Sequence, residues 1–408
     1  MLLVSLTLLL ARLAFGQQQI SGSINVNSIL RQDSITPYED ADLPNSLRRF
    51  IRWAPKAELH VHVEGTLEPE MMMRFAERNG IPPPYPSVQA ARAAYNNFSD
   101  LEQFRRLFYS GCSVLRTRAD FYDLAIAYFR RAAISRVIHA EVFFDPQAHL
   151  SNGVEFDTFM GGLVDAAMDA EDQLAMTVSY IMCFRRDMSL ESAERALMLA
   201  LPWRHRIVAV GLDASNLARP PREFAPLFDR AAALGFKRTA HVGEEGSPEY
   251  IWQALQLLHV DRLDHGIHCL DDPRLVAALN TSRVPLTICP VSDMKLKVYD
   301  GKLEERLRQL IRSGLLVTVN SDDAAYFGAY LAGNYEWLSM AVGLNVRQAA
   351  QLVANGFQAA FSLPDAQRRR MVDTVWRMAE AEEAGEKAEG EEAEAEGSSR
   401  RRLLTVRR

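Results

Sequence analysis

Residues 55–65 read Pro-Lys-Ala-Glu-Leu-His-Val-His-Val-Glu-Gly, and this stretch marks the expected start of the folded domain. Its centre is a β-type run, 57–62, that ends in His60 and His62. Successive side chains of a strand point to opposite faces, so these two imidazoles point to the same side. The pair can share a metal ion, although a His-x-His pair also arises by chance.

Seven further β-type runs follow and alternate with longer helical patterns, which is typical of repeated βα units around a parallel sheet. Eight such units predict a (β/α)8 barrel, with inserted helices after the first strand between residues 101 and 131. The predicted strands are 57–62, 137–143, 175–182, 207–212, 237–241, 262–265, 285–289 and 315–320. The clearest helical patterns are 68–79, 156–172, 248–258 and 303–313.

The two ends of the chain differ from this barrel region, and we expect three parts: 1–53, 54–379 and 380–408. The first part holds an apolar run and then a polar arm without periodicity. The apolar run has no basic residue before it and is too short to span a bilayer. We therefore expect a cytoplasmic protein, with the nucleus as a further location and with secretion as the alternative if the run is a cleaved signal. The last part is Glu-rich and then basic, typical of a solvated helix or a disordered tail.

The bulk composition favours a small-molecule ligand. The formal net charge is -6, whereas binding to a nucleic-acid backbone needs clustered Lys and Arg. Neither a nucleic acid nor a membrane is an expected partner, and the oligomeric state is left open. The cysteines stand singly within apolar segments, which favours buried thiols in a reducing compartment over disulfides. They are Cys112, Cys183, Cys269 and Cys289.

Polar clusters follow three later strands. They are His241-Val-Gly-Glu-Glu-Gly, Asp264-His265-Gly-Ile-His and Asn320-Ser-Asp-Asp. Each acid alone could be a helix cap or a partner of a helix dipole. Together, three histidines and an aspartate fall at the carboxyl ends of strands one, five and eight, where barrel enzymes place their chemistry. The mixed nitrogen and oxygen donors predict a zinc site.

These motifs resemble the adenosine/adenine deaminases of the amidohydrolase type, over residues 55 to about 364. The resemblance lies in 55–69, 241–249, 264–270 and 321–328. It implies that one zinc ion per chain is held by His60, His62, His241 and Asp322. It also implies that Glu244 protonates the purine N1, that His265 assists deprotonation of the attacking water, and that Asp323 contacts N7.

The glutamate at position 64 indicates which substrate to expect. The nucleoside branch of the family resembles this chain but carries an aspartate there that meets the ribose, and the longer glutamate is similar to the free-base branch. The resemblance therefore implies hydrolysis of adenine to hypoxanthine and ammonia, as in purine salvage. Two departures stand out: residues 211–216 lack the Leu-Ala-Gly of the nucleoside enzymes, which leaves the N3 contact unassigned, and Asp293 replaces the usual Asn. Glu64 could instead be an acid near the start of helix 68–79.

Two alternatives remain at this point, and a further class of zinc enzyme is excluded. One is an enzyme for adenosine or an N6-substituted purine. The zinc deaminases of nucleic-acid bases need Pro-Cys-x-x-Cys, and Cys289-Pro290 has no partner cysteine. The last alternative is a catalytically silent barrel whose tail binds a partner. The acid-base groups expected around the metal, beyond its ligands, argue against that reading.

Overall fold

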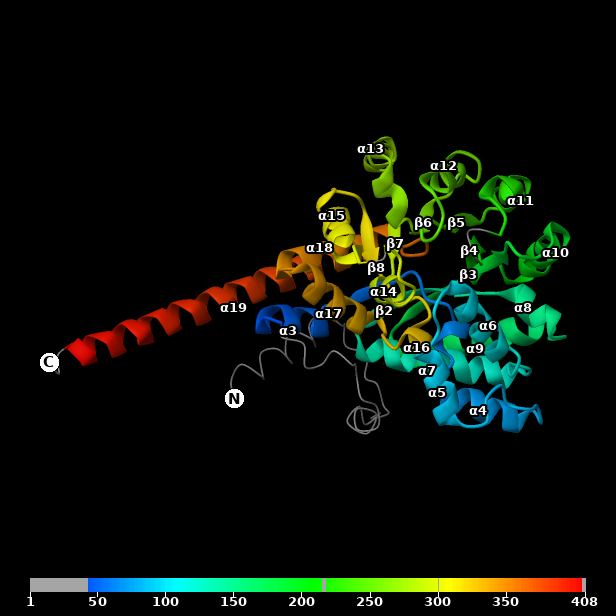
Figure 1. The fold of residues 1–408 in the computed structure, drawn as a ribbon, viewed down its shortest axis with the longest axis horizontal. Helices are drawn as coiled ribbons and strands as arrows, with labels where there is room; N and C mark the ends of the chain where they lie inside the picture. Colours follow the sequence, from blue (N-terminus) through cyan, green and yellow to red (C-terminus); the bar gives the residue numbers. More distant parts are fainter. Residues whose placement is uncertain (1–42, 215–217, 300, 406–408) are drawn as a thin grey trace. The chain divides into compact units, whose positions relative to one another are not determined.

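The computed structural model describes residues 43–405, apart from 215–217 and 300. Eight parallel strands form one sheet in the order β1 to β8, and helices surround it (Figure 1). This confirms the expected (β/α)8 barrel. The strands are β1 Lys56–Glu58, β2 Val137–Phe144, β3 Thr177–Arg185, β4 Ile207–Asp213, β5 Lys237–Val242, β6 Arg262–His265, β7 Leu286–Ile288 and β8 Val317–Val319.

The join between the first and last strands is irregular. β1 ends at Glu58, so the predicted strand 57–62 is too long, and both imidazoles follow the strand. Single bridges continue the sheet there, from Val61 to Asp322 and from His62 to Phe143. The Asp322 amide donates to the His60 carbonyl at 3.0 Å, and the His62 amide donates to the Asp322 carbonyl at 3.2 Å. These bonds hold the two histidines at the barrel rim.

The outer helices bury one face each against the sheet. Three predicted helices begin where expected and end within two residues of the prediction, at α9 Phe156–Leu174, α12 Pro248–Gln256 and α15 Leu303–Arg312. The others that follow strands are α8 Pro146–Ser151, α10 Leu190–Ala200, α11 Ala225–Ala233, α13 Pro273–Ser282, α14 Pro290–Lys295, α16 Ala324–Phe327, α17 Leu331–Val342 and α18 Val346–Ala359. Short 3-10 turns are η1 Glu64–Thr66, η2 Leu201–Trp203, η3 Pro221–Phe224 and η4 Ile267–Asp271.

The insertion after β1 consists of four helices: α4 Pro69–Arg78, α5 Val88–Tyr95, α6 Leu101–Cys112 and α7 Arg118–Ile134. The helix α7 packs against α9 and so takes the place of the first crossover helix. The helix α6 contacts η1, beside the carboxyl ends of the strands. Its residues Phe104 and Phe108 pack with Tyr326 and Phe327 into a cluster that we call the aromatic cap. The sequence analysis predicted inserted helices, and the cap is what they contribute to the barrel rim.

The packed core begins before Pro55, where the sequence analysis placed its start. The helix α3, Asn45–Trp53, buries Leu47, Phe50 and Ile51 and contacts α17, α18 and α19. The helix α19, Asp365–Thr405, includes the acidic segment, so the described part of this tail is helical. Arg49 of α3 pairs with Glu382 of α19 at 2.8 Å. The N-terminal apolar run lies outside the described residues.

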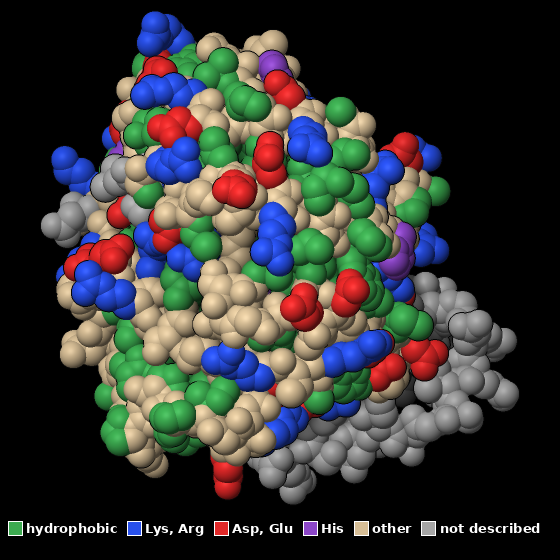
Figure 2. Space-filling view, turned by 90° about the vertical axis from the view of Figure 1, so that its right-hand side faces the viewer, with side chains coloured by type: hydrophobic (Ala, Val, Ile, Leu, Met, Phe, Trp, Pro, Cys, Tyr) green, Lys and Arg blue, Asp and Glu red, His purple; other side chains and the backbone are tan. Residues whose placement is uncertain are grey.

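The described surface bears on the expected partners. Basic and acidic side chains are interspersed over the face shown in Figure 2, without a large area of one sign. Among the described residues, no helix is both long enough and apolar enough to cross a membrane. The four cysteines predicted to be buried are all buried, with free thiols.

Candidate metal and catalytic site

Four side chains predicted to hold a metal converge at the rim of the barrel. The Nε2 atom of His241 lies 3.0 Å from Nε2 of His60 and 3.2 Å from Nε2 of His62. The Asp322 Oδ1 atom lies 3.5 Å from Nε2 of His60 and 3.4 Å from that of His62. All four residues are buried. The prediction that these four residues come together is confirmed.

This donor set fits a tetrahedral zinc ion. A Zn–N bond of about 2.0–2.1 Å implies that neighbouring donors of a tetrahedron are roughly 3.4 Å apart. The distances above are close to that value. Burial lowers the pKa of His241 to about 3, which leaves the neutral imidazole that metal binding requires. The four residues therefore form a candidate site for a divalent metal.

The other ring nitrogens of two histidines have partners that orient them. His60 Nδ1 lies 2.9 Å from the Thr287 hydroxyl, and that hydroxyl lies 3.1 Å from Asp264 Oδ1. His241 Nδ1 lies 3.2 Å from the Leu212 carbonyl. Such outer partners fix the ring orientation and present Nε2 to the metal. The sequence analysis did not identify Thr287, because a threonine inside a strand carries no distinctive pattern.

The predicted catalytic pair lies beside the metal ligands. Glu244 Oε2 is 3.8 Å from His265 Nε2, which is also 3.8 Å from Asp322 Oδ2. Burial raises the pKa of Glu244 to about 8. For His265, burial lowers the pKa, but the carboxylates of Glu244 and Asp322 raise it more. His265 and Asp322 both have left-handed backbone, with φ of 62° and 59°, a strain often found at functional sites.

Asp293 packs against the far side of the His265 ring. Its Oδ1 atom lies 3.6 Å from His265 Nδ1, and both residues are buried. The sequence analysis left open whether this departure from the usual Asn faces the pocket or the solvent. The side chain faces neither, because it is enclosed behind His265. Asn216, in the other departing segment, lies outside the described residues.

Asp323 lines the cavity above the metal ligands, as its expected contact with the substrate requires. Burial, and then the neighbouring Asp322, raise the pKa of this carboxyl well above its ordinary value. Gly65 makes its position possible, because any side chain there would collide with the Asp323 side chain. The sequence analysis quoted this glycine within its motif without assigning it a role.

Glu64 does not line the cavity. It is buried, and its Oε1 atom lies 2.7 Å from His149 Nε2 and accepts from the Asp145 amide at 3.0 Å. Its Oε2 atom has no hydrogen-bond partner. Its hydrogen-bond contacts therefore lie with the segment that follows β2. Asp145 and His149 follow β2 in the stretch Asp-Pro-Gln-Ala-His, which the sequence analysis did not single out.

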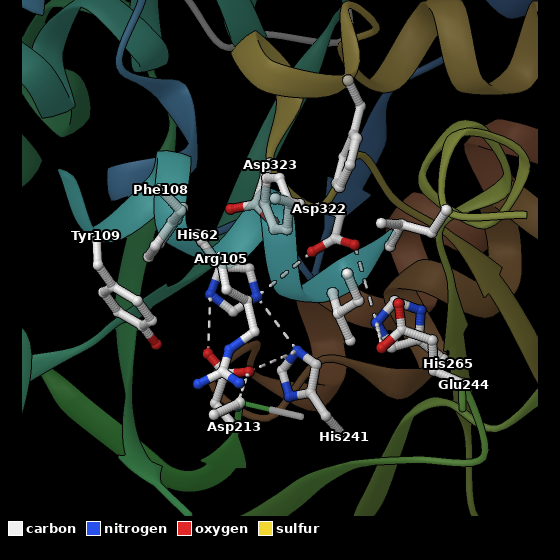
Figure 3. A pocket seen from close by; sticks show the side chains of 15 residues that line it. His62, Arg105, Phe108, Tyr109, Asp213, His241, Glu244, His265, Asp322 and Asp323 are labelled. Carbon is white, nitrogen blue, oxygen red and sulfur yellow. Dashed lines mark hydrogen bonds and ion pairs between the residues drawn. The ribbon is translucent and has the colours of Figure 1, made fainter. Parts of the chain in front are cut away.

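The cavity itself lies between the barrel rim and α6. Figure 3 shows Glu244 and His265 on one side of it and Asp213, from the end of β4, below His62 and beside His241. The helix α6 contributes Phe104, Phe108, Arg105 and Tyr109. Carboxyl and imidazole groups thus face aromatic rings across a narrow space. Such a space suits a flat, nitrogen-rich heterocycle.

Comparisons with known proteins agree with this geometry. A family model described as adenosine deaminase matches residues 55–378. Adenine deaminase of Geotalea uraniireducens is 48% identical over 308 residues, which are 75% of this chain and 86% of the relative. Adenine deaminase of Albidiferax ferrireducens is 44% identical over 342 residues, 84% of this chain and 97% of the relative.

Solved structures give the same result. The crystal structure of adenine deaminase from Arthrobacter aurescens has 42% sequence identity and a TM-score of 0.77, and the match covers 80% of this chain and 99% of that one. An amidohydrolase from Burkholderia ambifaria, solved with bound Zn, has a TM-score of 0.77 at 23% identity, over 84% of this chain and 96% of that one. At that lower identity the likeness shows the shared fold.

Proposed function

The chain belongs to the adenosine deaminase family, and from this premise we propose that it hydrolyses adenine to hypoxanthine and ammonia. The proposal rests on one observation, the closeness of the predicted metal ligands to an acid-base pair. Four side chains suited to metal binding converge beside a buried pair, Glu244 and His265, that can move protons. His265 Nε2 lies 3.8 Å from Asp322 Oδ2, one of the four, and 3.8 Å from Glu244 Oε2. The relatives at 44–48% identity named adenine deaminase support the choice of substrate.

We further propose that the metal is zinc, one ion per chain, held by His60, His62, His241 and Asp322. The donor set and its spacing support this choice. When bound, zinc lowers the pKa of a coordinated water to about 7. The remaining chemistry depends on the residues around the purine ring.

Glu244 supplies the proton that the ring needs. Water can add to C6 only if N1 accepts a proton as aromaticity is lost, and the raised pKa keeps this carboxyl protonated near pH 7. His265 lies beside the metal ligands, where it orients the attacking water. A bound cation would offset the carboxylates that raise the pKa of this imidazole, so that the neutral ring could accept the proton that the water releases. Asp323 faces the same cavity and holds N7, which fixes the ring. The C6 amine then leaves as ammonia and takes the proton of the new C6 hydroxyl, which leaves a carbonyl oxygen at C6 of an aromatic ring. The proton held by His265 returns to Glu244, which lies 3.8 Å away.

We also propose a cytoplasmic location. The four cysteines are buried and carry free thiols, which suits a reducing compartment.

The test of the function uses the purified full chain with one equivalent of zinc. Ammonia release and the ultraviolet change of the ring are followed with adenine and, separately, with adenosine. We expect turnover of adenine, loss of turnover after chelation, and recovery when zinc is added back. Turnover of adenosine in preference to adenine would contradict the proposal, and absence of turnover with both would favour the silent barrel.

A further inference from the structure

Asp213 has a carboxylate in the cavity that the proposed mechanism does not use. It is the last residue of β4, and its side chain is 16% exposed into a cavity whose other acidic residues already have roles. Figure 3 shows it below His62, beside His241 and close to Arg105. Asp213 thus lies at the barrel rim, on the β4 side of the cavity. On this side the sequence analysis could not assign a contact to the purine N3.

The backbone at Ala214 leaves this side of the cavity with a hydrogen-bond acceptor, the Asp213 carboxylate. Ala214 has a φ of 74°, and its amide donates to Asp213 Oδ1 at 2.5 Å. The Ala214 amide therefore already has an acceptor and does not donate to a substrate. Asp213 Oδ2 has only a long contact, 3.7 Å, to His62 Nδ1. The wall thus offers a carboxylate oxygen toward the cavity.

An acceptor here discriminates between a free base and a nucleoside. With N1 at Glu244 and N7 at Asp323, the remaining edge of a purine carries N3 and N9. Free adenine has one N–H on that edge, whichever of the two nitrogens bears the hydrogen. A nucleoside has only the N3 lone pair there, beside a bulky substituent on N9. A carboxylate oxygen attracts the N–H and repels the lone pair.

We propose that Asp213 is a specificity-determining residue that accepts the N–H on the N3/N9 edge of an unsubstituted 6-aminopurine. The proposal rests on the proposed function and adds to it a residue that selects the free base. Arg105 supports the role because it closes the same side of the cavity, where its own partner is Asp187 at 2.6 Å. A substituent on N9 would meet both side chains.

The test compares adenine with 9-methyladenine, which has a methyl group in place of that N–H. For the zinc-loaded protein we expect kcat/KM to be at least about 10³-fold higher for adenine, since a site built for a substrate N–H can reject an analogue without it by about 10⁴–10⁵. In Asp213→Ala and Asp213→Asn the ratio falls at least tenfold, mainly through loss of adenine activity. Glu171→Gln, which removes a surface ion pair with Arg206, is the control and keeps the ratio.

Binding measurements separate this inference from the function itself. Calorimetry with purine and 9-methylpurine tests Asp213 even if the protein turns over neither adenine nor adenosine. We expect the wild type to prefer purine and the Asp213 variants to lose the preference. Equal handling of adenine and 9-methyladenine by the wild type would overturn the inference and leave adenine deamination intact.

Zinc analysis excludes a structural role for Asp213. The inference requires that both variants keep one zinc per chain with unchanged affinity. If they lose zinc, and activity falls equally with both substrates, Asp213 serves to orient His62 and the inference is wrong. A second zinc in the wild type that disappears in the variants would also overturn it, because the carboxylate would then be a metal ligand.

Discussion

Two opposing effects set the pKa of Glu244, and their balance decides the pH range in which the protein can act. Burial raises the pKa of the carboxyl, while the neighbouring His265 lowers it, and the outcome is about 8. The carboxyl is therefore protonated below that pH and able to give a proton to N1. Above it the group is ionised and has no proton to give.

This balance predicts the pH dependence of the reaction. Between pH 6 and pH 8 we expect Glu244 to cause no decrease in kcat/KM for adenine. Above about pH 8 we expect kcat/KM to fall as Glu244 ionises. Glu244→Gln should lower kcat by about 10²–10⁴-fold, which is the usual contribution of general acid catalysis, and should retain zinc. The measurements are pH-rate profiles and metal content. A variant that loses its zinc would show that Glu244 supports the metal site.

Thr287 provides a second prediction at this scale. Thr287→Val removes the hydroxyl that fixes the His60 ring and keeps the shape of the side chain. We expect zinc affinity to fall about 10–100-fold, as is usual when an outer partner of a ligand is lost. Competition with a chelator measures the affinity. Thr318→Val on the adjacent strand β8 is the matched control, and an equal loss there would point to a general packing defect.

The site was predictable from the sequence to the extent that it depends on strand ends. His60, His62, His241 and Asp322 meet because parallel strands of a barrel finish at one rim. Thr287 and Asp145 were not predictable, since their contacts depend on the tilt and register between neighbouring strands. Those quantities arise when the sheet closes, and the periodicity of a single strand does not contain them.

Among the elements, helices matched their predicted bounds better than the first strand did. Pro248 begins α12 as predicted because proline at the first position favours a helix start. β1 is three residues long because the chain leaves the regular ladder to form single bridges to both neighbours. Alternation of side chains cannot reveal that departure. By contrast, α3 does carry a helical pattern, with Leu47, Phe50 and Ile51 on one face, and the polar residues before it hid this signal.

The start of α7 leads to a prediction at the scale of the element. Asp120 is buried and accepts from the Thr117 amide at 2.7 Å and from the Arg116 amide at 2.9 Å, as well as from Asn79. Asp120→Ala leaves these donors unpaired, so we expect the free energy of unfolding to fall by about 3 kcal/mol. Urea unfolding measures it.

The same helix offers a matched control. Asp123 pairs with Arg78 at 2.7 Å, with a side chain 36% exposed. Asp123→Ala should cost at most about 1 kcal/mol, as exposed ion pairs do. A similar loss in both variants would mean that the buried cap has no special importance.

At the scale of the whole barrel, one ion pair crosses the interior. Arg262 Nη1 lies 2.7 Å from Glu141 Oε2, and its Nη2 donates to the Leu59 carbonyl at 3.0 Å. Both side chains are fully buried. The pair thus ties β6 to β2 and to the segment that follows β1, below the metal ligands.

This pair should make stability depend on acid. Burial raises the pKa of Glu141, but Arg262 lowers it more, from 4.5 to about 2. A depressed carboxyl stabilises the fold above its unfolded pKa, and that contribution is lost as the pH falls from 4.5 toward 2. At pH 7 Glu141→Gln should lower the free energy of unfolding by about 3–5 kcal/mol, because it leaves Arg262 unpaired. Denaturant unfolding of both proteins at pH 7 and pH 3 checks this, and a difference that does not shrink at pH 3 would refute it.

The irregular join of β1 and β8 would give a bound metal a second task. Within the described sheet the two strands share no ladder, and the ring is completed where the backbones of His60 and His62 meet that of Asp322. The same three residues offer their side chains to the ion. A bound ion would therefore cross-link the first and last strands of the barrel. Metal binding would then be coupled to folding, and the free energy of binding would add to the free energy of unfolding.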